Sequence, residues 1–556
     1  MGSKQSPSTG AQAALEEPVS VTPSFDGSEY YRRYRAEERL PIFNRGSFSV
    51  PRVQPILPSL DKTNDRVFFG YLIVISCFIF FFELTNFSLS IDDELHFWGG
   101  SWWREWLTQG RWGTALLSGL LMPYPVFPFV PLLLAITCNA VAYVMVVRLW
   151  EPQSRSVAKF VAAPFALGFP TLIHLYSFTS INWAVGAGWM VMAIGLSSFT
   201  AASRKKKATA RFAAIACFAL GTSIYQSLLA FLLVIYLIQL ASRIAGGSLA
   251  DTRVVARDVA GFSFVVLASL VLYQLIATGA QAYFGLEPAY LDKFNNFEFT
   301  ESYLSSALAN TFREARTIYL GTHDLYLSRV PVVGLTIALS MLSIAHLIAK
   351  AETSIGLKCV LVAIFAAVVV VPFSLNLLSG GYMPHRTLVG LPIAIAGIVF
   401  IGSSRMSGRW RDAVLLLTAA NVLVFAIASN KSFYAASLSY QHDRETAIMI
   451  LDDIRDLVDL KGEGTQPILF VGHHSLRNTH LNPHVYSSTI GKSLFEWDKV
   501  NERLVAFYKI MGHHYFRPAS PEERKRLRGS IPKHAWPSKQ SIAYRQGVII
   551  VNLGRR

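Results

Sequence analysis

The sequence predicts a mainly α-helical protein: a polytopic transmembrane bundle of about eleven spans, followed by a small C-terminal α/β domain. Of its 556 residues, 52% are hydrophobic and 16% are charged, whereas about a quarter of the residues in an ordinary soluble protein are charged. The apolar residues gather in runs of roughly 18–22, the length that a helix needs to cross ~30 Å of hydrocarbon. The basic residues concentrate in alternate loops, which is the pattern of a membrane protein with a fixed orientation.

The chain begins with a polar segment, residues 1–65, which is rich in Ser, Pro, Glu and Arg. We expect this tail to be cytoplasmic and largely disordered, and, because it holds no long apolar run, we expect no cleavable signal peptide. Residues 66–429 are expected to form the transmembrane catalytic bundle. Its predicted spans are residues 67–89, 128–147, 157–174, 182–200, 211–224, 226–242, 259–280, 329–349, 357–378, 387–403 and 412–429.

The basic residues determine the predicted orientation. The short segments near 175–181 and 225 contain no Lys or Arg, whereas the segments that alternate with them are basic. A cytoplasmic N-terminus places the basic segments inside and the C-terminus outside, as the positive-inside rule expects. The net charge of +15 follows this alternation, so we expect no nucleic-acid partner. The inside residues are Arg148, Arg155, Lys159, Arg204, Lys205, Lys206, Lys207, Arg211, Arg243, Arg253, Arg257, Lys350, Lys358, Arg405, Arg409 and Arg411.

Three predicted outer segments are long enough to build a site or a domain. The loop 85–127 is rich in tryptophan, and we expect its middle part to be a helix lying in the membrane interface. The loop 281–327 mixes acids with aromatic residues and is expected to cap a cavity above the bundle. Residues 430–556 are expected to form a soluble outer domain with a helix over 443–460 and buried strands over 467–471 and 547–551.

The first of these loops contains three adjacent acids, Asp92, Asp93 and Glu94. Carboxylates at a membrane boundary are costly to desolvate, so three together need water, cationic neighbours or a chemical role. One interpretation is a solvated cluster that caps the following helix. The other is a general base that takes the proton from an attacking hydroxyl, with a pKa raised by burial and by like-charged neighbours.

Cationic and polar residues at the predicted outer face complement these acids. Arg386 lies in a short loop beside two glycines, and Arg104 and Arg111 lie on the tryptophan helix. A guanidinium matches the oxygens of a phosphate, although arginines at an interface also reach towards lipid headgroups. Tyr225 and Gln226 stand where two short spans meet, and they suit either sugar binding or the completion of the helix ends.

The sequence contains no Walker motif and no dinucleotide fingerprint, so the energy for a reaction must arrive in an activated substrate. Adjacent carboxylates also suit Mg²⁺ or Mn²⁺, which bind oxygen ligands, and a divalent cation therefore remains possible as a cofactor.

Several segments resemble the bacterial serotype-converting glucosyltransferases, which modify O-antigen. The resemblance extends over roughly residues 70–556 and leaves the basic N-terminal tail uncovered. The segments that carry it are Ile91-Asp92-Asp93-Glu94, Trp106 with Gln109-Gly110-Arg111-Trp112, Ile224-Tyr225-Gln226-Ser227, Pro384-His385-Arg386-Thr387, residues 490–498, Arg503 and Ala535-Trp536-Pro537.

This resemblance implies a GT-C-like architecture in the bacterial inner membrane, with the active site on the periplasmic side. The donor would be a polyprenyl-phosphate hexose, expected to be glucose, and the acceptor a lipid-linked O-antigen or another cell-surface polysaccharide. A separate donor synthase and a separate flippase would supply the donor. The expected catalytic acids are Asp92, Asp93 and Glu94. The expected phosphate-binding residues are Arg386, Arg111 and His385, and the expected sugar-binding residues are Tyr225, Gln226, Trp98 and Gln109.

Two alternatives remain open at this point. A transporter or flippase of lipid-linked sugars would need charged residues along the middle of the spans, and the predicted spans carry almost none. Another GT-C transferase or an O-antigen polymerase would share the membrane bundle and differ in its substrates.

Overall fold

The computed structural model divides the chain into two units, Met1–Gln54 and Pro55–Arg556, and only parts of the second are described here. The predicted tail 1–65 lies almost wholly outside the described residues. These are residues 63–98, 102–121, 128–151, 157–205, 208–287, 300–328, 330–404, 406–458, 460, 465–475, 489–497 and 500–554.

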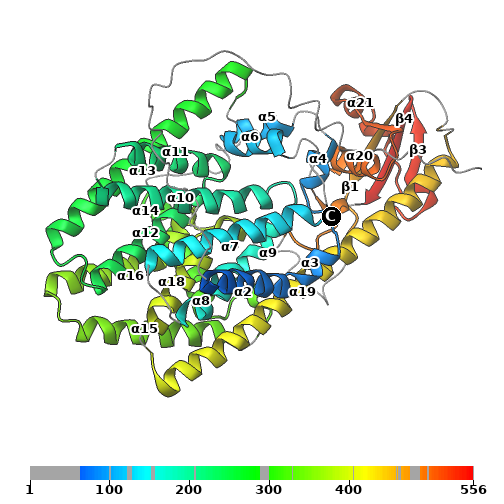
Figure 1. The fold of residues 1–556 in the computed structure, drawn as a ribbon. Helices are drawn as coiled ribbons and strands as arrows, with labels where there is room; N and C mark the ends of the chain where they lie inside the picture. Colours follow the sequence, from blue (N-terminus) through cyan, green and yellow to red (C-terminus); the bar gives the residue numbers. More distant parts are fainter. Residues whose placement is uncertain are drawn as a thin grey trace, which may run out of the picture. The chain divides into compact units, whose positions relative to one another are not determined.

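The described part is mainly helical, with a small sheet near its C-terminal end (Figure 1). Seven helices or helical runs in it are long and apolar enough to cross a membrane, which is compatible with a membrane protein. They are α7 (Val130–Trp150), α10 (Asn182–Lys205), α12 (Leu228–Ala245), α13 (Thr252–Phe284), α15 (Val332–Lys350), the run of α16 (Ile355–Val370), η3 (Val371–Phe373) and α17 (Ser374–Leu378), and α19 (Gly408–Arg455).

Shorter helices occupy the remaining predicted spans. Helix is present within all eleven predicted ranges, but seven meet the length and hydropathy of a span, so the number of crossings stays a prediction. The segment 211–242 is two helices, because α11 ends at Ile224 and α12 begins at Leu228. These shorter helices are α2 (Thr63–Ile79), α3 (Phe81–Thr85), α8 (Ala158–Leu167), α9 (Thr171–Tyr176), α11 (Ala208–Ile224) and α18 (Leu391–Ser404). A further short apolar helix, α6 (Trp112–Leu121), lies in the predicted outer loop 85–127.

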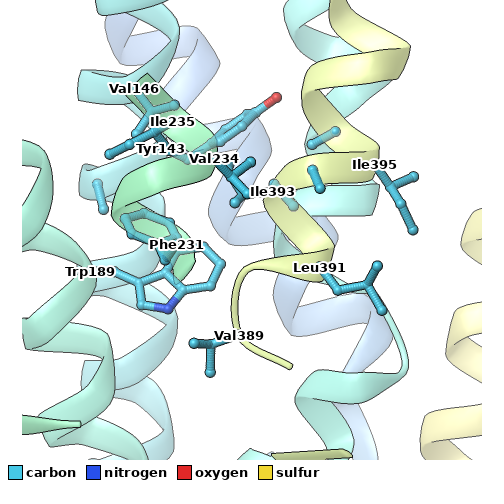
Figure 2. Packing of buried hydrophobic residues seen from close by; sticks show 14 of the residues in the cluster. Tyr143, Val146, Trp189, Phe231, Val234, Ile235, Val389, Leu391, Ile393 and Ile395 are labelled. Atoms are coloured by element: carbon cyan, nitrogen blue, oxygen red, sulfur yellow. The ribbon is translucent and has the colours of Figure 1, made fainter. Parts of the chain in front are cut away.

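Helix α18 forms the centre of the bundle core. It packs against α8, α12 and α15, and it is apolar on all sides, as a helix with no solvent-facing stripe must be. Figure 2 shows its residues Leu391 and Ile393 among buried side chains of neighbouring helices, with Trp189 of α10 against Phe231 of α12. The centroids of those two rings are 4.5 Å apart. This core packs the helices whose ends carry the candidate site residues Tyr225, Gln226 and Arg386.

The C-terminal part differs from the prediction in one respect. The sequence suggests a span over 412–429 and a separate helix over 443–460, whereas the structure has one continuous helix, α19, from Gly408 to Arg455. The polar residues near position 430 interrupt the apolar run but do not break the helix, because neither Pro nor Gly occurs there. Helix α19 therefore connects the bundle directly to the predicted C-terminal domain, whose described residues belong to the same compact unit as the bundle (Figure 1).

The sheet of this domain has four strands in the order β2-β1-β4-β3. Strand β1 pairs in parallel with β2 and β4, and β3 pairs antiparallel with β4. The two predicted strands correspond to β1 and β4. The strands are β1 (Gln466–Gly472), β2 (Phe516–Pro518), β3 (Ile542–Arg545) and β4 (Val548–Gly554).

The other elements lie in the predicted outer segments. Within the predicted loop 281–327, the described residues form α14 (Glu301–Tyr319) and η2 (Asp324–Tyr326). The first outer loop forms α4 (Asp93–Trp98) and α5 (Trp102–Thr108) before α6, so the predicted tryptophan helix is two helices joined by a turn at 109–111. The remaining short elements are η4 (His385–Thr387), η5 (Leu494–Glu496), α20 (Val500–Ile510), α21 (Pro521–Arg526), η6 (Arg528–Ser530) and η7 (Lys539–Ser541).

Candidate functional site

The three predicted acids stand at the start of α4, and their side chains diverge. Asp92 immediately precedes the helix with φ of +76°, a left-handed conformation that Asp tolerates better than most residues. Asp93 and Glu94 are fully buried, whereas 45% of the Asp92 side chain is exposed. The left-handed residue thus directs one carboxylate towards solvent and two into the protein.

Asp93 joins α4 to the connector between α9 and α10. Its two carboxylate oxygens accept hydrogen bonds from the backbone N–H groups of Thr179 and Ser180, each at 3.0 Å. Burial raises the pKa of Asp93 to about 7, although these hydrogen bonds oppose the rise. Because both carboxylate oxygens accept hydrogen bonds from the backbone of the connector, Asp93 holds the connector against α4.

Glu94 and Asp92 share a cation from the C-terminal domain. Arg503 of α20 donates to Glu94 Oε1 and, at 2.8 Å, to Asp92 Oδ1. Burial raises the pKa of Glu94 to about 8, and the charge of Arg503 opposes this rise. The same ion pairs raise the pKa of Arg503 despite its burial.

Arg503 is a site residue that the sequence-based prediction missed. It occurs among the segments of the resemblance, but its role cannot be inferred from its position, which is 411 residues from Asp92. The available signal was a basic residue among the apolar residues of 500–510, a stretch for which no helix was predicted and which the structure shows to be α20 (Val500–Ile510). Its side chain is only 10% exposed, and a buried charge requires a partner of opposite sign.

Arg111 lies beside aromatic rings between the acids and the bundle. Its guanidinium carbon is 5.6 Å from the centroid of Trp106 and 4.8 Å from that of Tyr225, within the range of cation–π attraction. The ring of Trp106 in turn stacks on His96 of α4, with centroids 4.6 Å apart. Arg111 and α4 are therefore parts of one local structure.

Gln226 holds the turn that carries Arg111. Its Nε2 donates to the carbonyl of Gln109 at 2.7 Å, and its Oε1 accepts from Arg111 Nε at 3.3 Å. Gly110 between them has φ of +72°, and a Cβ there would lie 2.6 Å from the hydroxyl of Tyr273. The Gln226 amide is thus engaged within the protein, while the buried Gln109 Oε1 has no hydrogen-bond partner among the described residues.

Arg386 lies on the other side of Tyr225. The Tyr225 hydroxyl donates to the Arg386 carbonyl at 3.5 Å, and the Arg386 guanidinium carbon is 4.9 Å from the ring centroid of Phe178. Phe178 precedes Thr179, which binds Asp93. Within the described residues, no acid forms an ion pair with Arg386. The structure therefore brings Asp93, Arg386, Tyr225 and Arg111 into one continuous network.

His385 points into a separate cavity of about 500 Å³. Its Nε2 lies 3.2 Å from Glu314 Oε1 of α14, close enough for an ion pair but outside hydrogen-bond geometry. Its ring centroid is 5.1 Å from that of His323. This arrangement places His385 against a carboxylate rather than beside Arg111.

Glu314, His323 and His385 are the described residues whose ligand atoms are close enough to share a metal ion, all lying within 4.8 Å of one another. Their hydrogen bonding does not favour this. His323 Nδ1 accepts from the Leu325 backbone N–H at 3.1 Å, which leaves the proton of the neutral ring on Nε2. That nitrogen is then a donor and not a metal ligand.

The remaining predicted residue, Trp98, ends α4, and its side chain lies outside the described part of the chain.

The family model for glucosyl transferase GtrII matches residues 81–401, whereas no curated protein matches the chain. The match covers more than half of the sequence and contains the predicted site residues, but it ends before α19 and Arg503. It confirms the resemblance to the serotype-converting glucosyltransferases and favours an enzyme over a transporter. The chain therefore belongs to the glucosyl transferase GtrII family and is a glycosyltransferase.

Proposed function

We propose that this glycosyltransferase moves a glucosyl residue from a polyprenyl-phosphate donor to a lipid-linked O-antigen or another cell-surface polysaccharide. The reaction would take place at the periplasmic face of a bacterial inner membrane, with the N-terminus in the cytoplasm and the C-terminus in the periplasm. The observation that carries the proposal is the half-exposed carboxylate of Asp92, held beside buried acids in the same network as Arg111 and Arg386.

Asp92 is the acid best placed to act as the general base. Its Oδ1 accepts from Arg503, and its Oδ2 has no hydrogen-bond partner among the described residues, so it is available to an incoming hydroxyl. The acceptor oxygen attacks the anomeric carbon of the sugar while Asp92 takes the hydroxyl proton. The bond from that carbon to the phosphate oxygen breaks, and polyprenyl phosphate leaves with the electron pair.

Two arginines are proposed to stabilise the leaving phosphate. The Arg386 guanidinium has no acidic partner in the described structure and is half-buried against Phe178. Arg111 is held by Gln226 and by the rings of Trp106 and Tyr225. Preorganised guanidinium groups in a partly desolvated site stabilise developing negative charge without reorganisation. His385 Nε2 lies 3.2 Å from Glu314 Oε1, so its contribution to phosphate binding is proposed to be smaller.

The aromatic elements α5 and α6 are proposed to lie at headgroup depth. Trp103 contacts Phe284 at the end of α13, with ring centroids 4.8 Å apart, and Gln281 Nε2 donates to the Leu107 carbonyl at 2.8 Å. These contacts attach α5 to the end of a membrane-length helix, where Trp is favoured at the lipid–water boundary. A lipid-borne phosphate would lie at the same depth.

The test uses the purified chain with polyprenyl-phosphate glucose and a lipid-linked polysaccharide acceptor. We expect release of polyprenyl phosphate that depends on the acceptor, and its loss in Asp92→Asn. The matched control is Glu301→Gln, which removes an exposed charge at the start of α14. Full transfer by Asp92→Asn, Asp93→Asn and Glu94→Gln alike would contradict the assignment of these acids. Comparing surface glycans with and without the protein would identify the sugar and the acceptor.

A further inference from the structure

We propose that Arg503 of the C-terminal domain is a positioning residue for transfer, and that the domain completes the active site by orienting Asp92 and Glu94. This inference rests on the proposed function. It extends the machinery beyond the segment that matches the family, which ends at residue 401.

The contact is direct and largely shielded from solvent. Helix α20 packs on α4, and the Arg503 side chain is 10% exposed where it meets Glu94, which is 0% exposed. One guanidinium nitrogen donates to Glu94 and the other donates to Asp92. The planar fork of Arg makes two such bonds at fixed positions, which the single ammonium of Lys does not reproduce.

Arg503 is the main anchor of Glu94 in the described structure. The second oxygen of Glu94, Oε2, is buried and has no hydrogen-bond partner among the described residues. Without Arg503, the carboxylate would remain buried without a cation, which strongly favours its protonation or its movement. Asp92 would lose the bond that orients its Oδ1, and its exposed oxygen would no longer be held towards the acceptor.

Hydrogen bonds to α19 and to β1 hold α20, the helix that carries Arg503. The hydroxyl of Tyr508 on α20 donates to the Ala447 carbonyl of α19 at 2.7 Å. Asn501 Oδ1 accepts from the Phe470 backbone N–H of β1 at 3.0 Å. Since α19 continues without interruption from the bundle, these bonds fix α20 relative to the helices that hold the arginines of the site.

A further contact fixes the segment before α20. The buried carboxylate of Asp443 on α19 accepts from Ser493 Oγ at 2.5 Å and from the Leu494 backbone N–H at 2.7 Å. These bonds attach η5 to the same long helix. Helix α19 thus holds both η5 and, through the Tyr508 hydroxyl, the helix that carries Arg503.

The test compares Arg503→Gln and Arg503→Lys with Arg524→Gln in the full chain. Arg524 forms an ion pair with Glu502 in the same domain, and none of its hydrogen bonds to described residues goes to α4, so its variant controls for the loss of a domain ion pair. We expect Arg503→Gln to lower kcat by about 100-fold, the cost of a small misplacement of catalytic groups, with donor KM changed less than about threefold. Arg503→Lys should recover about a tenth of the wild-type kcat, and Arg524→Gln should match the wild type within about twofold.

Hydrogen exchange of the α4 amides provides a readout that does not depend on activity. Faster exchange in Arg503→Gln than in Arg524→Gln is expected. If the wild-type chain transfers no sugar yet α4 loses protection in Arg503→Gln, the proposed function fails while the positioning contact stands. If the wild type is active and Arg503→Gln retains both its kcat and its α4 protection, the positioning role is overturned. If Arg503→Gln does not fold, a wild-type kcat in Arg503→Lys overturns it equally.

Discussion

Two groups of ionisable residues in this protein look similar in composition and differ in arrangement. The acid cluster consists of Asp92, Asp93 and Glu94, and its members accept hydrogen bonds from backbone N–H groups or from Arg503. The histidine cavity contains Glu314, His323 and His385 around a space of about 500 Å³. The acid cluster leaves one carboxylate oxygen free near solvent, whereas the cavity pairs its carboxylate with a histidine. The proposed base therefore lies in the acid cluster, where an oriented carboxylate has an oxygen without a partner among the described residues, and not in the larger open space of the cavity.

The largest expected effect separates the two groups directly. Asp92→Asn removes the base, and the rate of transfer should fall by about 10³-fold. His385→Gln removes only a residue that is held against Glu314, and its rate should fall by less than about tenfold. Steady-state release of polyprenyl phosphate measures both. A greater loss of transfer rate in His385→Gln than in Asp92→Asn would contradict the assignment of the base to Asp92.

The pH dependence of transfer should report the acid cluster. Glu94 must be ionised to hold Arg503, and burial raises its pKa to about 8 while Arg503 opposes the rise. Lowering the pH through this value protonates Glu94 and weakens the ion pair, so kcat should fall as the pH falls, by about 100-fold at pH 6 relative to the plateau. Asp93, with a pKa raised to about 7 by burial, would steepen the fall. A rate that is constant from pH 6 to pH 9 would show that neither protonation matters.

Gly110→Ala should have a smaller effect through the turn that carries Arg111. Gly110 has φ of +72°, and a Cβ would meet the Tyr273 hydroxyl at 2.6 Å. We expect a loss of about 1–2 kcal/mol in the free energy of unfolding and a several-fold lower rate, since Arg111 would shift. Thermal unfolding and transfer assays measure these changes. Gly119→Ala is the control, because a Cβ at that position meets no atom within 4 Å.

The smallest expected effect is that of chelation. If arginines stabilise the leaving phosphate, EDTA should change the rate of transfer by less than about twofold. A requirement for Mg²⁺ or Mn²⁺ would instead indicate that the acids or the histidine cavity bind a cation during transfer. Restoration of activity by the added ion in the EDTA-treated wild type, but not in His385→Gln, would assign that cation to the cavity.

Much of the fold was predictable because hydrophobicity and charge act locally along the chain. The apolar runs located the helices, and the adjacent acids Asp92, Asp93 and Glu94 marked the start of α4. The continuity of α19 was missed because the polar residues near position 430 resemble the end of a span, although they keep helical geometry.

The partners of the site residues were not predictable, because they come from distant parts of the chain. The bond between Arg503 and Asp92 joins residues 411 positions apart, and no local pattern encodes it. Gln226 was expected to contact sugar, yet its amide binds Gln109 and Arg111 across the turn between α5 and α6.

Asp92 is proposed to act as the base for a hydroxyl acceptor, and azide provides an acceptor that needs no base. Azide attacks without losing a proton, so it needs no base. Asp92→Gly is the suitable variant, because glycine adopts φ of +76° without strain. If Asp92 is the base, this variant should no longer glucosylate the polysaccharide but should convert polyprenyl-phosphate glucose and azide into glucosyl azide and polyprenyl phosphate. Wild-type transfer to the polysaccharide by Asp92→Gly would contradict this role of Asp92.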